Sequence, residues 1–584
     1  MMRFGIFAGS LTLAGAALVP AIAQAETPPV FGEAIERSHY ISSFDGTRIA
    51  VSIHVPTRAG RPVSERLPVV VTQFRSDGMA ETMQPFLRAG YVWVAQDRRG
   101  TGASFGVQTG FVNQADARDA KAVIEWAAAQ SFSTGKVVAT GCSNQGAWQY
   151  LAATLKPKGL VAIAPACASP QFFDHGVKLN GIPMLPLADK PYAGECARPQ
   201  GGARPVGAVL PPPQRVDEDT DGTLLRAAVK GQQCGAQMLG QYWRDMPRDG
   251  VDPTTGRRPG LEDSAITAWQ AIKASGIGVL QLGGWYDAAV AGQLEGQRLW
   301  GGRLVMGPWV HVNRPGEGST FPEAGIDLDD ETLRWFDAYA KGIGQPRKPS
   351  IRYYTMNAPA GREWREAATW PSYRKVRYHF APDGTLSRAA PARDAAPAVY
   401  AGRDVPWFGG KYMPLMRFWA GDMAATDAQS LTHTLAPLDR DTEVTGTPTA
   451  ELWVSADTPD ANVFAVLEDV APDGRSTYVT DGRLRASWRA VAKPAWAQGQ
   501  TWHRGHAEDI KPLVPGEPTS LAFDFFPTSW VFKAGHRIRV SIVTSLGARY
   551  QDPTLAMGRT PHLTLYRDAA HRSSVNLPIA PTRR

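Results

Sequence analysis

The feature that most constrains the fold is the alternation of short apolar runs with helical segments early in the chain. The apolar runs are residues 67–73 (LPVVVTQ), 91–96 (YVWVAQ), 136–141 (KVVATG) and 160–166 (LVAIAPA), and an alanine-rich helical pattern at 115–130 separates the second from the third. Continuous apolar strands that alternate with helices are typical of a parallel sheet covered on both faces. The pattern predicts an α/β fold, preceded by a hairpin at Asp45 and Gly46.

This alternation stops after Ala166 and resumes near residue 277. The segment between is rich in Pro and Gly and contains helical islands such as residues 221–231 (DGTLLRAAVKG), which favours a helical cap inserted into the sheet. Apolar runs then return at 277–287 and 302–311, and a helical pattern follows at 329–344.

Beyond Pro349 the pattern is that of strands alone. In residues 536–543 (HRIRVSIV) the apolar side chains alternate strictly, with Ile538, Val540 and Ile542 on one face. Many such strands separated by turns predict a jelly-roll β-sandwich. We therefore expect a signal peptide at 1–25, the α/β domain at 26–166 and 276–345, a helical cap at 167–275 and a jelly roll at 346–584, since 584 residues exceed one core.

The N-terminus has the layout of a secretory signal. Arg3 precedes an uncharged apolar stretch, and Ala23-Gln24-Ala25 forms an A-x-A cleavage motif before Glu26. We expect cleavage near Glu26 and an exported protein, periplasmic or secreted, with no membrane attachment afterwards. An uncleaved membrane anchor is the alternative, because the uncharged stretch is long enough to span a bilayer.

Composition excludes two broad classes of protein. With 43% hydrophobic and 20% charged residues the chain is not intrinsically disordered. The net charge is +7, but the basic residues are scattered among acids, so we expect no nucleic-acid partner. No metal or organic cofactor is implied, and the oligomeric state stays open, with a homo-oligomer allowed.

Four cysteines are present: Cys142, Cys167, Cys196 and Cys234. Their spacing fits no zinc template, whereas an oxidising compartment permits disulfides. We predict a Cys196–Cys234 bridge, because this pair flanks a segment rich in Pro and Gly. Cys142 is expected to be a small buried thiol, with pairing to Cys167 as the alternative.

The segment GCSNQG, residues 141–146, contains the candidate nucleophile Ser143. A serine hydroxyl reacts only when a base removes its proton and fixed donors stabilise the oxyanion. A sharp strand-to-helix turn meets both needs, because it exposes the hydroxyl and directs the first helical N–H groups at the reacting centre. A serine that merely caps the helix is the alternative.

Two residues downstream complete a candidate triad. Asp287 and His311 each end an apolar run, and the chain order Ser, Asp, His is that of hydrolases built on such a sheet. His175 is the alternative base, but it precedes Asp287 and lies at the cap boundary, so we expect it to have a structural or pocket-lining role.

The same residues carry a family resemblance. The segments FDGTRIA, FLRAGYVWVAQDRRGTGASFG, GCSNQG, GGWYD, GPWVH, LRWFDAYAKG and WVFKAGHRIRVSI occur in this order along the chain. The chain resembles the cocaine esterase-like (CocE/NonD) serine hydrolases, which are relatives of the α-amino acid ester hydrolases, cephalosporin acylases and X-Pro dipeptidyl-peptidases. The resemblance implies an α/β-hydrolase domain, a helical cap and a C-terminal jelly roll, with Ser143 as nucleophile, His311 as base and Asp287 as orienting acid.

Two positions depart from the family pattern. Asn144 stands where the family usually has Tyr, but its backbone N–H can still stabilise an oxyanion. Phe74-Arg75 stands where the family often has Pro-Tyr, whose hydroxyl completes the oxyanion hole, and losing one such donor costs about 10²–10³ in rate. We favour Arg75 as the replacement. A backbone donor, modest activity, binding of a substrate carboxylate and a solvated loop position are the alternatives.

Three further features have competing interpretations. Trp285, Tyr286 and Trp309 neighbour the candidate triad and could line a substrate pocket or belong to the core. Residues 97–106 (DRRGTGASFG) lack the P-loop lysine, so Asp97 and Arg99 are expected to form structural pairs. Residues 217–222 (DEDTDG) lack the Glu of a calcium loop, which favours a helix start, with binding of a substrate ammonium group as a third reading.

The expected function is that of an exported serine hydrolase that cleaves small carboxylic esters through an acyl-enzyme on Ser143. Ester is favoured over amide, because the oxyanion hole is altered. X-Pro dipeptidyl-peptidase or acylase (amidase) activity on the same triad is one alternative. A carbohydrate- or polymer-binding protein with an inactive hydrolase domain is the alternative from another class.

Overall fold

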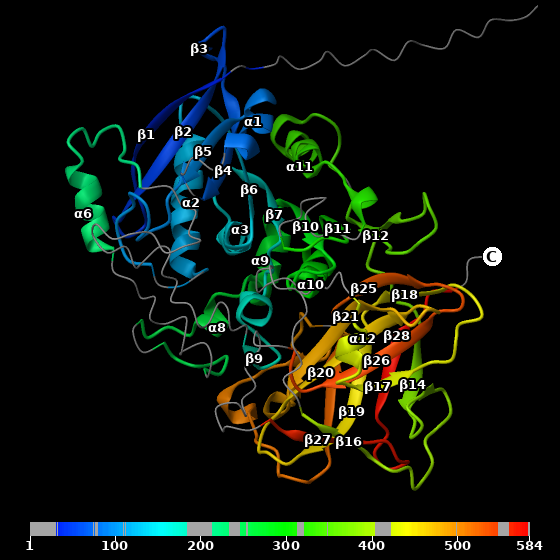
Figure 1. Ribbon diagram of the computed structural model, residues 1–584. Helices are drawn as coiled ribbons and strands as arrows, with labels where there is room; N and C mark the ends of the chain where they lie inside the picture. Colours follow the sequence, from blue (N-terminus) through cyan, green and yellow to red (C-terminus); the bar gives the residue numbers. More distant parts are fainter. Residues whose placement is uncertain are drawn as a thin grey trace, which may run out of the picture.

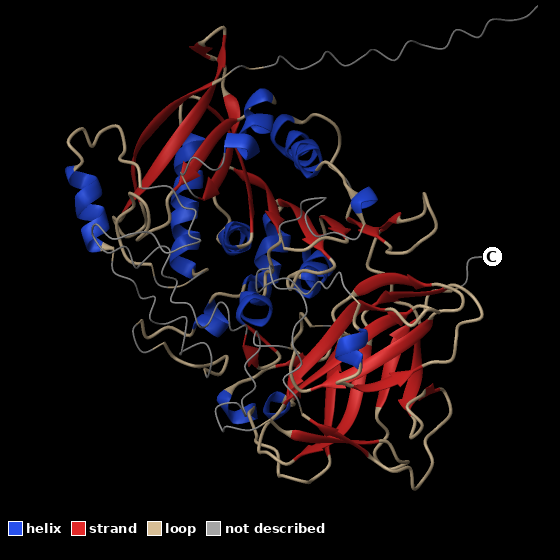
Figure 2. Ribbon diagram, viewed as in Figure 1, coloured by secondary structure: helices blue, strands red, loops and turns tan. Residues whose placement is uncertain are grey.

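The protein is described by a computed structural model of residues 31–581, except 32, 74, 76–79, 109, 111, 184–212, 233–245, 253–254, 312–320, 347, 403–421, 498 and 547–559. An α/β part is followed by a C-terminal part made almost wholly of strands (Figure 1, Figure 2). The expected signal peptide and the expected Cys196–Cys234 bridge lie outside the described residues. Among the described residues, no helix has both the length and the apolar character needed to cross a membrane.

An eleven-stranded sheet forms the centre of the α/β part. Its order is β1-β2-β5-β4-β6-β7-β10-β11-β12-β13, with β3 paired to β2. The pairs from β5 to β12 are parallel, and the pairs at the two edges are antiparallel. The strands are β1 Ala34–Ser42, β2 Arg48–Arg58, β3 Arg61–Pro62, β4 Leu67–Gln73, β5 Val92–Gln96, β6 Ser133–Cys142, β7 Leu160–Ala166, β10 Gly278–Gly284, β11 Arg303–Gly307, β12 Ser350–Tyr354 and β13 Trp364–Ala367.

Helices cover both faces of this sheet, which is why the central strands are apolar on both sides. Along β4, Val69 and Val71 pack with α2, α3 and α9, whereas Val70 packs with α1 and α11. These elements confirm the predicted α/β architecture. The helices are α1 Ala80–Arg88, α2 Gln114–Ala129, α3 Asn144–Thr154, α9 Trp269–Ser275, α10 Val290–Trp300 and α11 Leu328–Phe336.

The segment between β7 and β10 contains short helices, of which α6 (Thr223–Gly231) and α8 (Pro259–Glu262) are two. The buried Asp219 carboxylate accepts hydrogen bonds from the backbone N–H groups of Leu224 and Leu225 at 2.9 and 2.8 Å. The Asp217 carboxylate accepts from both the amide and the hydroxyl of Ser38 in β1. Residues 217–222 therefore form the predicted turn and helix start, and they attach α6 to the sheet edge.

The C-terminal part is a β-sandwich, as predicted. A seven-stranded sheet contains β15-β14-β28-β19-β27-β16 with β24 paired to β19, and a four-stranded sheet has the order β17-β26-β20-β21. Its principal strands are β14 Lys375–Phe380, β15 Leu386–Ser387, β16 Ala398–Ala401, β17 Leu431–Thr434, β18 Thr442–Gly446, β19 Thr449–Ala456, β20 Asn462–Val470, β21 Ser476–Arg485, β24 Thr519–Asp524, β25 Thr528–Phe532, β26 Arg537–Val543, β27 His562–Tyr566 and β28 Ser574–Pro578.

Strand β26 shows both the strength and the limit of the alternation rule. Ile538, Val540 and Ile542 are fully buried, as their spacing predicts. Ser541, on the opposite face, is buried as well, because its hydroxyl donates to the carboxylate of the buried Glu468 at 3.0 Å. A polar residue at an outward position therefore does not guarantee exposure.

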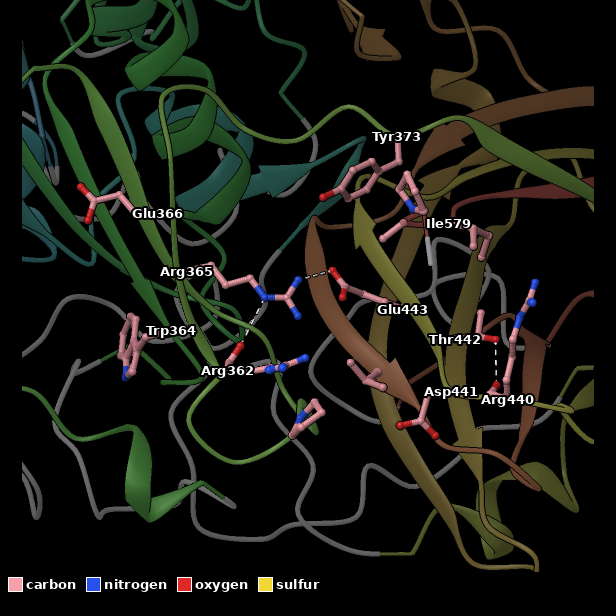
Figure 3. A pocket seen from close by; sticks show the side chains of 14 residues that line it. Arg362, Trp364, Arg365, Glu366, Tyr373, Arg440, Asp441, Thr442, Glu443 and Ile579 are labelled. Atoms are coloured by element: carbon pink, nitrogen blue, oxygen red, sulfur yellow. Dashed lines mark hydrogen bonds and ion pairs between the residues drawn. The ribbon is translucent and has the colours of Figure 1, made fainter. Parts of the chain in front are cut away.

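The sheet of the α/β part extends past residue 346, where the sequence suggests the boundary between the two parts. Strand β12 continues the α/β sheet in parallel with β11, and β13 closes its edge at Ala367. The Arg365 guanidinium of β13 donates to the Glu443 carboxylate of β18 at 2.6 Å. Both residues line a groove of about 620 Å³ (Figure 3). The α/β part and the β-sandwich are thus joined by the chain that follows β13 and by the ion pair between Arg365 and Glu443.

Buried histidines make the stability of the sandwich depend on pH. Burial and the nearby Arg567 guanidinium lower the pKa of His433 from 6.5 to about 4. Arg567 Nη1 lies 3.1 Å from His433 Nε2, so the neutral ring accepts this hydrogen bond. Because the unfolded state binds the proton first, the stability that this group contributes is present above pH 6.5 and is lost as the pH falls through 6.5 toward 4.

We expect His433→Gln to flatten this pH dependence, because glutamine can accept from Arg567 but does not titrate. Between pH 6.5 and 4 the free energy of unfolding of the wild type should fall by up to about 3 kcal/mol more than that of the variant. Thermal unfolding across this range measures the difference. His562→Gln, at a histidine that is 59% exposed, is the matched control and should run parallel to wild type. If the stability of His433→Gln fell with pH as steeply as that of the wild type, His433 would not be the source of the pH dependence.

Candidate active site

Ser143 occupies a strained turn between β6 and α3. Its φ is 61° and its ψ is −126°, a conformation that side-chain-bearing residues rarely adopt. Such strain costs about 1–3 kcal/mol and is concentrated at functional sites. The backbone N–H of Ser143 donates to Ala166 at the end of β7 at 3.0 Å, and the residue is partly exposed. The turn therefore holds the serine at the sheet edge, where a substrate can reach it.

The two glycines of GCSNQG permit this turn. Gly141 has a φ of 149°, and a Cβ on it would lie 2.6 Å from Gln145 Cβ. A Cβ on Gly146 would lie 2.6 Å from Ala168 Cβ and 2.8 Å from the carbonyl oxygen of Ala166. The helix can pack this tightly against β7 only where no side chain intervenes, which is the packing that the sequence motif predicts.

Asp287 and His311 form a buried pair. His311 Nδ1 lies 2.9 Å from one Asp287 carboxylate oxygen, and the other oxygen accepts from the Ala289 N–H at 2.9 Å. The loops after β10 and β11 are tied together, because the N–H of Tyr286 donates to the carbonyl of Trp309 at 3.1 Å. The carboxylate thus fixes the ring orientation through Nδ1, so that Nε2 is the ring nitrogen left for a proton transfer.

The three candidate residues follow β6, β10 and β11, whose carboxyl ends share one edge of the sheet. Cys142 Sγ, next to Ser143, lies 3.6 Å from the carbonyl oxygen of His311. Both sulfurs of Cys142 and Cys167 and a ring nitrogen of His311 lie within 4.8 Å of one another. The serine turn and the histidine loop are therefore immediate neighbours.

His175, the alternative base, has a different environment. Its Nδ1 lies 2.8 Å from the Ser169 hydroxyl, and the ring packs where a Cβ on Gly292 of α10 would lie 2.9 Å from it. The π-helix Phe173–Val177 carries this buried histidine. This buried contact agrees with the structural or pocket-lining role that its sequence position predicts.

Arg75, which we favour as the replacement oxyanion donor, is bonded to three other groups of the protein. Its Nε donates to the Ser52 hydroxyl at 3.0 Å, and Nη1 donates to the Gln214 carbonyl at 3.0 Å and pairs with Asp97 at 3.3 Å. Burial raises the pKa of the Asp97 carboxyl, and Arg75 opposes that shift. Arg75 is thus a buried residue and not a solvated loop residue, and its Nε and Nη1 groups are already bonded. Asn144 begins α3, whose first N–H groups have no intrahelical acceptor.

We expect Arg75→Met to affect stability more than catalysis. Removing the guanidinium leaves Asp97 without its buried partner, which costs about 3 kcal/mol, whereas loss of an oxyanion donor would lower kcat by about 10²–10³ at little cost in stability. Thermal unfolding and kcat, measured together, separate the two. Arg58→Met is the matched control, because the Arg58–Glu65 pair is exposed and contributes at most about 1 kcal/mol.

The three aromatic residues proposed for a pocket belong to the core instead. Trp285 and Tyr286 are 2% exposed and share a hydrophobic cluster with the β-sandwich, and Trp285 Nε1 donates to the carbonyl of Tyr354 in β12 at 2.7 Å. Trp309 is 1% exposed and packs under the α/β sheet against the position of Gly307. They are buried in the segments that lead to Asp287 and His311.

Asp97, which pairs with Arg75, and Arg99 form the structural pairs that the sequence suggests. Arg98 pairs with the buried Asp116, and Arg99 pairs with Asp119 at 2.6 Å. A Cβ on Gly102 would lie 2.2 Å from the Asp97 carboxylate, so the loop is closed tightly around that acid.

One feature of the site was only the alternative prediction, and another was not predicted. Cys142 and Cys167 form a disulfide with a Cα–Cα distance of 5.3 Å, so Cys142 is not the free buried thiol that we expected. The signal was present, because Cys142 ends β6 and Cys167 directly follows the neighbouring strand β7. The buried Gln149 side-chain amide donates to the carbonyl of Gln145 at 2.8 Å and accepts from the N–H of Ala164 at 3.2 Å. Nothing in the sequence pattern distinguished this glutamine.

Comparison with known proteins is consistent with this geometry. Residues 45–313 match the X-Pro dipeptidyl-peptidase (S15) family, and residues 344–576 match the X-Pro dipeptidyl-peptidase C-terminal non-catalytic domain. A Mycobacterium bovis protein described as a serine esterase is 29% identical, over 93% of this chain and 95% of its own. The cocaine esterase of a Rhodococcus species is 27% identical, over 87% of this chain and 90% of its own.

Solved structures share the whole architecture. An α-amino acid ester hydrolase superposes with a TM-score of 0.71 at 20% identity, covering 97% of this chain and 100% of its own. A CocE/NonD family hydrolase from Staphylococcus aureus gives 0.68 at 18% identity, covering 94% of each chain. At these identities the likeness concerns the fold.

Fold, site and relatives together define a serine hydrolase with an α/β-hydrolase fold and a C-terminal β-sandwich. Within that class, the chain belongs to the CocE/NonD and X-Pro dipeptidyl-peptidase superfamily.

Proposed function

We propose that the protein is an exported esterase that cleaves carboxylic esters through an acyl-enzyme on Ser143. The observation that carries this proposal is the Asp287–His311 hydrogen bond of 2.9 Å beside the strained Ser143 turn. A hydroxyl, an oriented imidazole and a helix N-terminus are the parts that acyl transfer requires.

The proposed mechanism follows from these positions. His311 Nε2 takes the proton of the Ser143 hydroxyl as its oxygen attacks the ester carbonyl, and Asp287 stabilises the imidazolium. The backbone N–H of Asn144 donates to the oxyanion at the start of α3. His311 then protonates the departing alcohol. A water molecule, deprotonated by the same nitrogen, releases the acid and restores Ser143.

Two observations favour an ester over an amide. Relatives that match nearly the whole chain are described as a serine esterase and a cocaine esterase. Arg75, the side chain considered as a second oxyanion donor, is bonded to Asp97, Ser52 and Gln214. An amine departs less readily than an alcohol. An oxyanion hole with fewer side-chain donors therefore suits ester cleavage better than amide cleavage.

Export rests on two independent features. The N-terminal apolar stretch ends in an A-x-A motif before Glu26, and the Cys142–Cys167 disulfide suits an oxidising compartment. Mass analysis of the protein recovered from the periplasm or medium should find a mature N-terminus near Glu26. A full-length protein retained in the cytoplasm would contradict export.

Hydrolysis of matched ester and amide pairs tests the activity, with Ser143→Ala as the blank. The pairs should carry neutral, α-amino or ω-carboxylate acyl groups, so that the acyl preference is read in the same assay. We expect ester turnover that vanishes in Ser143→Ala, and covalent labelling of Ser143 by a fluorophosphonate. Equal rates for the two proteins on every pair would contradict the proposal, and faster cleavage of amides would make the enzyme an acylase or peptidase.

A further inference from the structure

The Cys142–Cys167 disulfide lies at the point where three chain segments of the proposed active site meet. Cys142 is the last residue of β6 and directly precedes Ser143, and Cys167 directly follows β7. The ladder between the two strands ends at the Cys142 and Ala166 pair. Beyond that pair, the disulfide and the Ser143 N–H bond to Ala166 are the two connections between the strands that the structure describes at the turn.

The disulfide also connects the serine turn to the acid and base segments. The N–H of Cys167 donates to the carbonyl of Leu282 in β10 at 2.8 Å, and β10 leads into the turn that carries Asp287. On the other side, Cys142 Sγ packs 3.6 Å from the carbonyl oxygen of His311. One covalent bond therefore contacts all three segments that carry the candidate triad.

The backbone at Cys167 is held in an unusual conformation. Its φ is 39°, in the left-handed region that favours glycine, and the side chain is 2% exposed. Without the disulfide, no covalent bond holds the end of β6 to the residue that follows β7. Loss of the bond would therefore let Cys142, and with it Ser143, shift relative to the His311 segment.

We infer that the Cys142–Cys167 disulfide is a positioning element of the catalytic centre, which holds Ser143 and His311 in register for proton transfer. This inference rests on the proposed function. It differs from an ordinary stabilising role, because it places the effect of the bond on the chemical step. A misplacement of about 1 Å at a reacting group can cost about 10² in rate.

The test compares wild type with Cys142→Ala/Cys167→Ala, and uses Cys196→Ser/Cys234→Ser as the matched control. All three are assayed at a temperature where circular dichroism shows the protein to be folded. We expect the first variant to lose about 10- to 100-fold in kcat, with KM little changed, and to label more slowly with a fluorophosphonate by the same factor. The control should match wild type in both measurements.

A second variant guards against a folding defect. Cys142→Ala/Cys167→Gly removes the same bond but places at 167 a residue that adopts φ 39° without strain. We expect the same loss of kcat in this variant. Wild-type kcat in either folded variant would overturn the inference, and so would a failure of both variants to fold, which would make the bond purely structural.

The outcomes also separate the two proposals. If wild type is not labelled at Ser143, the proposed function fails and the positioning role fails with it. If wild type and the disulfide variants are labelled at equal rates, the positioning role alone is wrong.

Discussion

Asp287→Asn should lower kcat by about 10⁴ while leaving the fold intact, as the same change does in other Ser-His-Asp enzymes. The asparagine oxygen can keep the hydrogen bond from the Ala289 N–H. Its amide group then faces His311 Nδ1 and donates to it, which leaves the ring proton on Nε2, the nitrogen that must accept from Ser143. Steady-state kinetics on the preferred ester, together with thermal unfolding, measure the two effects.

Asp263→Asn is the matched control for that prediction. Asp263 is also buried, and burial raises the pKa of its carboxyl to about 7. Its carboxylate accepts hydrogen bonds from Gln114 at the start of α2 and from Arg257. Its replacement should leave kcat unchanged. A second comparison, His311→Gln against His175→Gln, should show the large loss only at His311. Equal losses would mean that His175 takes part in the reaction.

Gly146→Val should both destabilise the protein and impair catalysis. Its Cβ would lie 2.6 Å from Ala168 Cβ and 2.8 Å from the carbonyl oxygen of Ala166, so α3 must move away from β7. Overpacking of this kind costs about 1–3 kcal/mol. Because Ser143 immediately precedes α3, the same movement should lower kcat by about 10².

Gly231→Val tests whether the effect belongs to the site. Gly231 ends α6, and a Cβ there has no heavy atom within 4 Å. Thermal unfolding and kcat should both stay near the wild-type values. If Gly146→Val kept its activity as well, the close approach of α3 to β7 would not be what positions Ser143.

The β-sandwich contributes to this site through packing and not through chemistry. Trp285 and Tyr286, which directly precede Asp287, share a hydrophobic cluster with the sandwich strands. The Tyr286 hydroxyl lies 3.1 Å from Met356 Sδ, and its ring centroid is 6.3 Å from that of Tyr478. The segment that leads to Asp287 is thus packed against residues of the C-terminal part.

Local patterns predicted the strands and the order of the candidate triad. Residues 67–73 and 160–166 are β4 and β7 at their full lengths, because a strand buried on both faces must be apolar throughout. Asp287 and His311 could be placed at one sheet edge, since parallel strands all end there.

Non-local pairing decided what local patterns could not. Strands β12 and β13, which lie beyond residue 346, belong to a sheet whose other strands are far away in sequence, and local alternation does not say which sheet a strand joins. Arg75 has its particular role because the fold brings Ser52, Asp97 and Gln214 around it.

By itself, the sequence determined the α/β architecture, the sandwich that follows it and the three candidate residues that follow β6, β10 and β11, because hydrophobic periodicity and turn chemistry are local properties. Only the tertiary structure decided that Cys142 is bonded to Cys167, that Trp285, Tyr286 and Trp309 are core residues, and that Arg75 is committed to Asp97. Each of these depends on which distant segments come into contact, and burial and partnership are properties of that contact and not of the residue type.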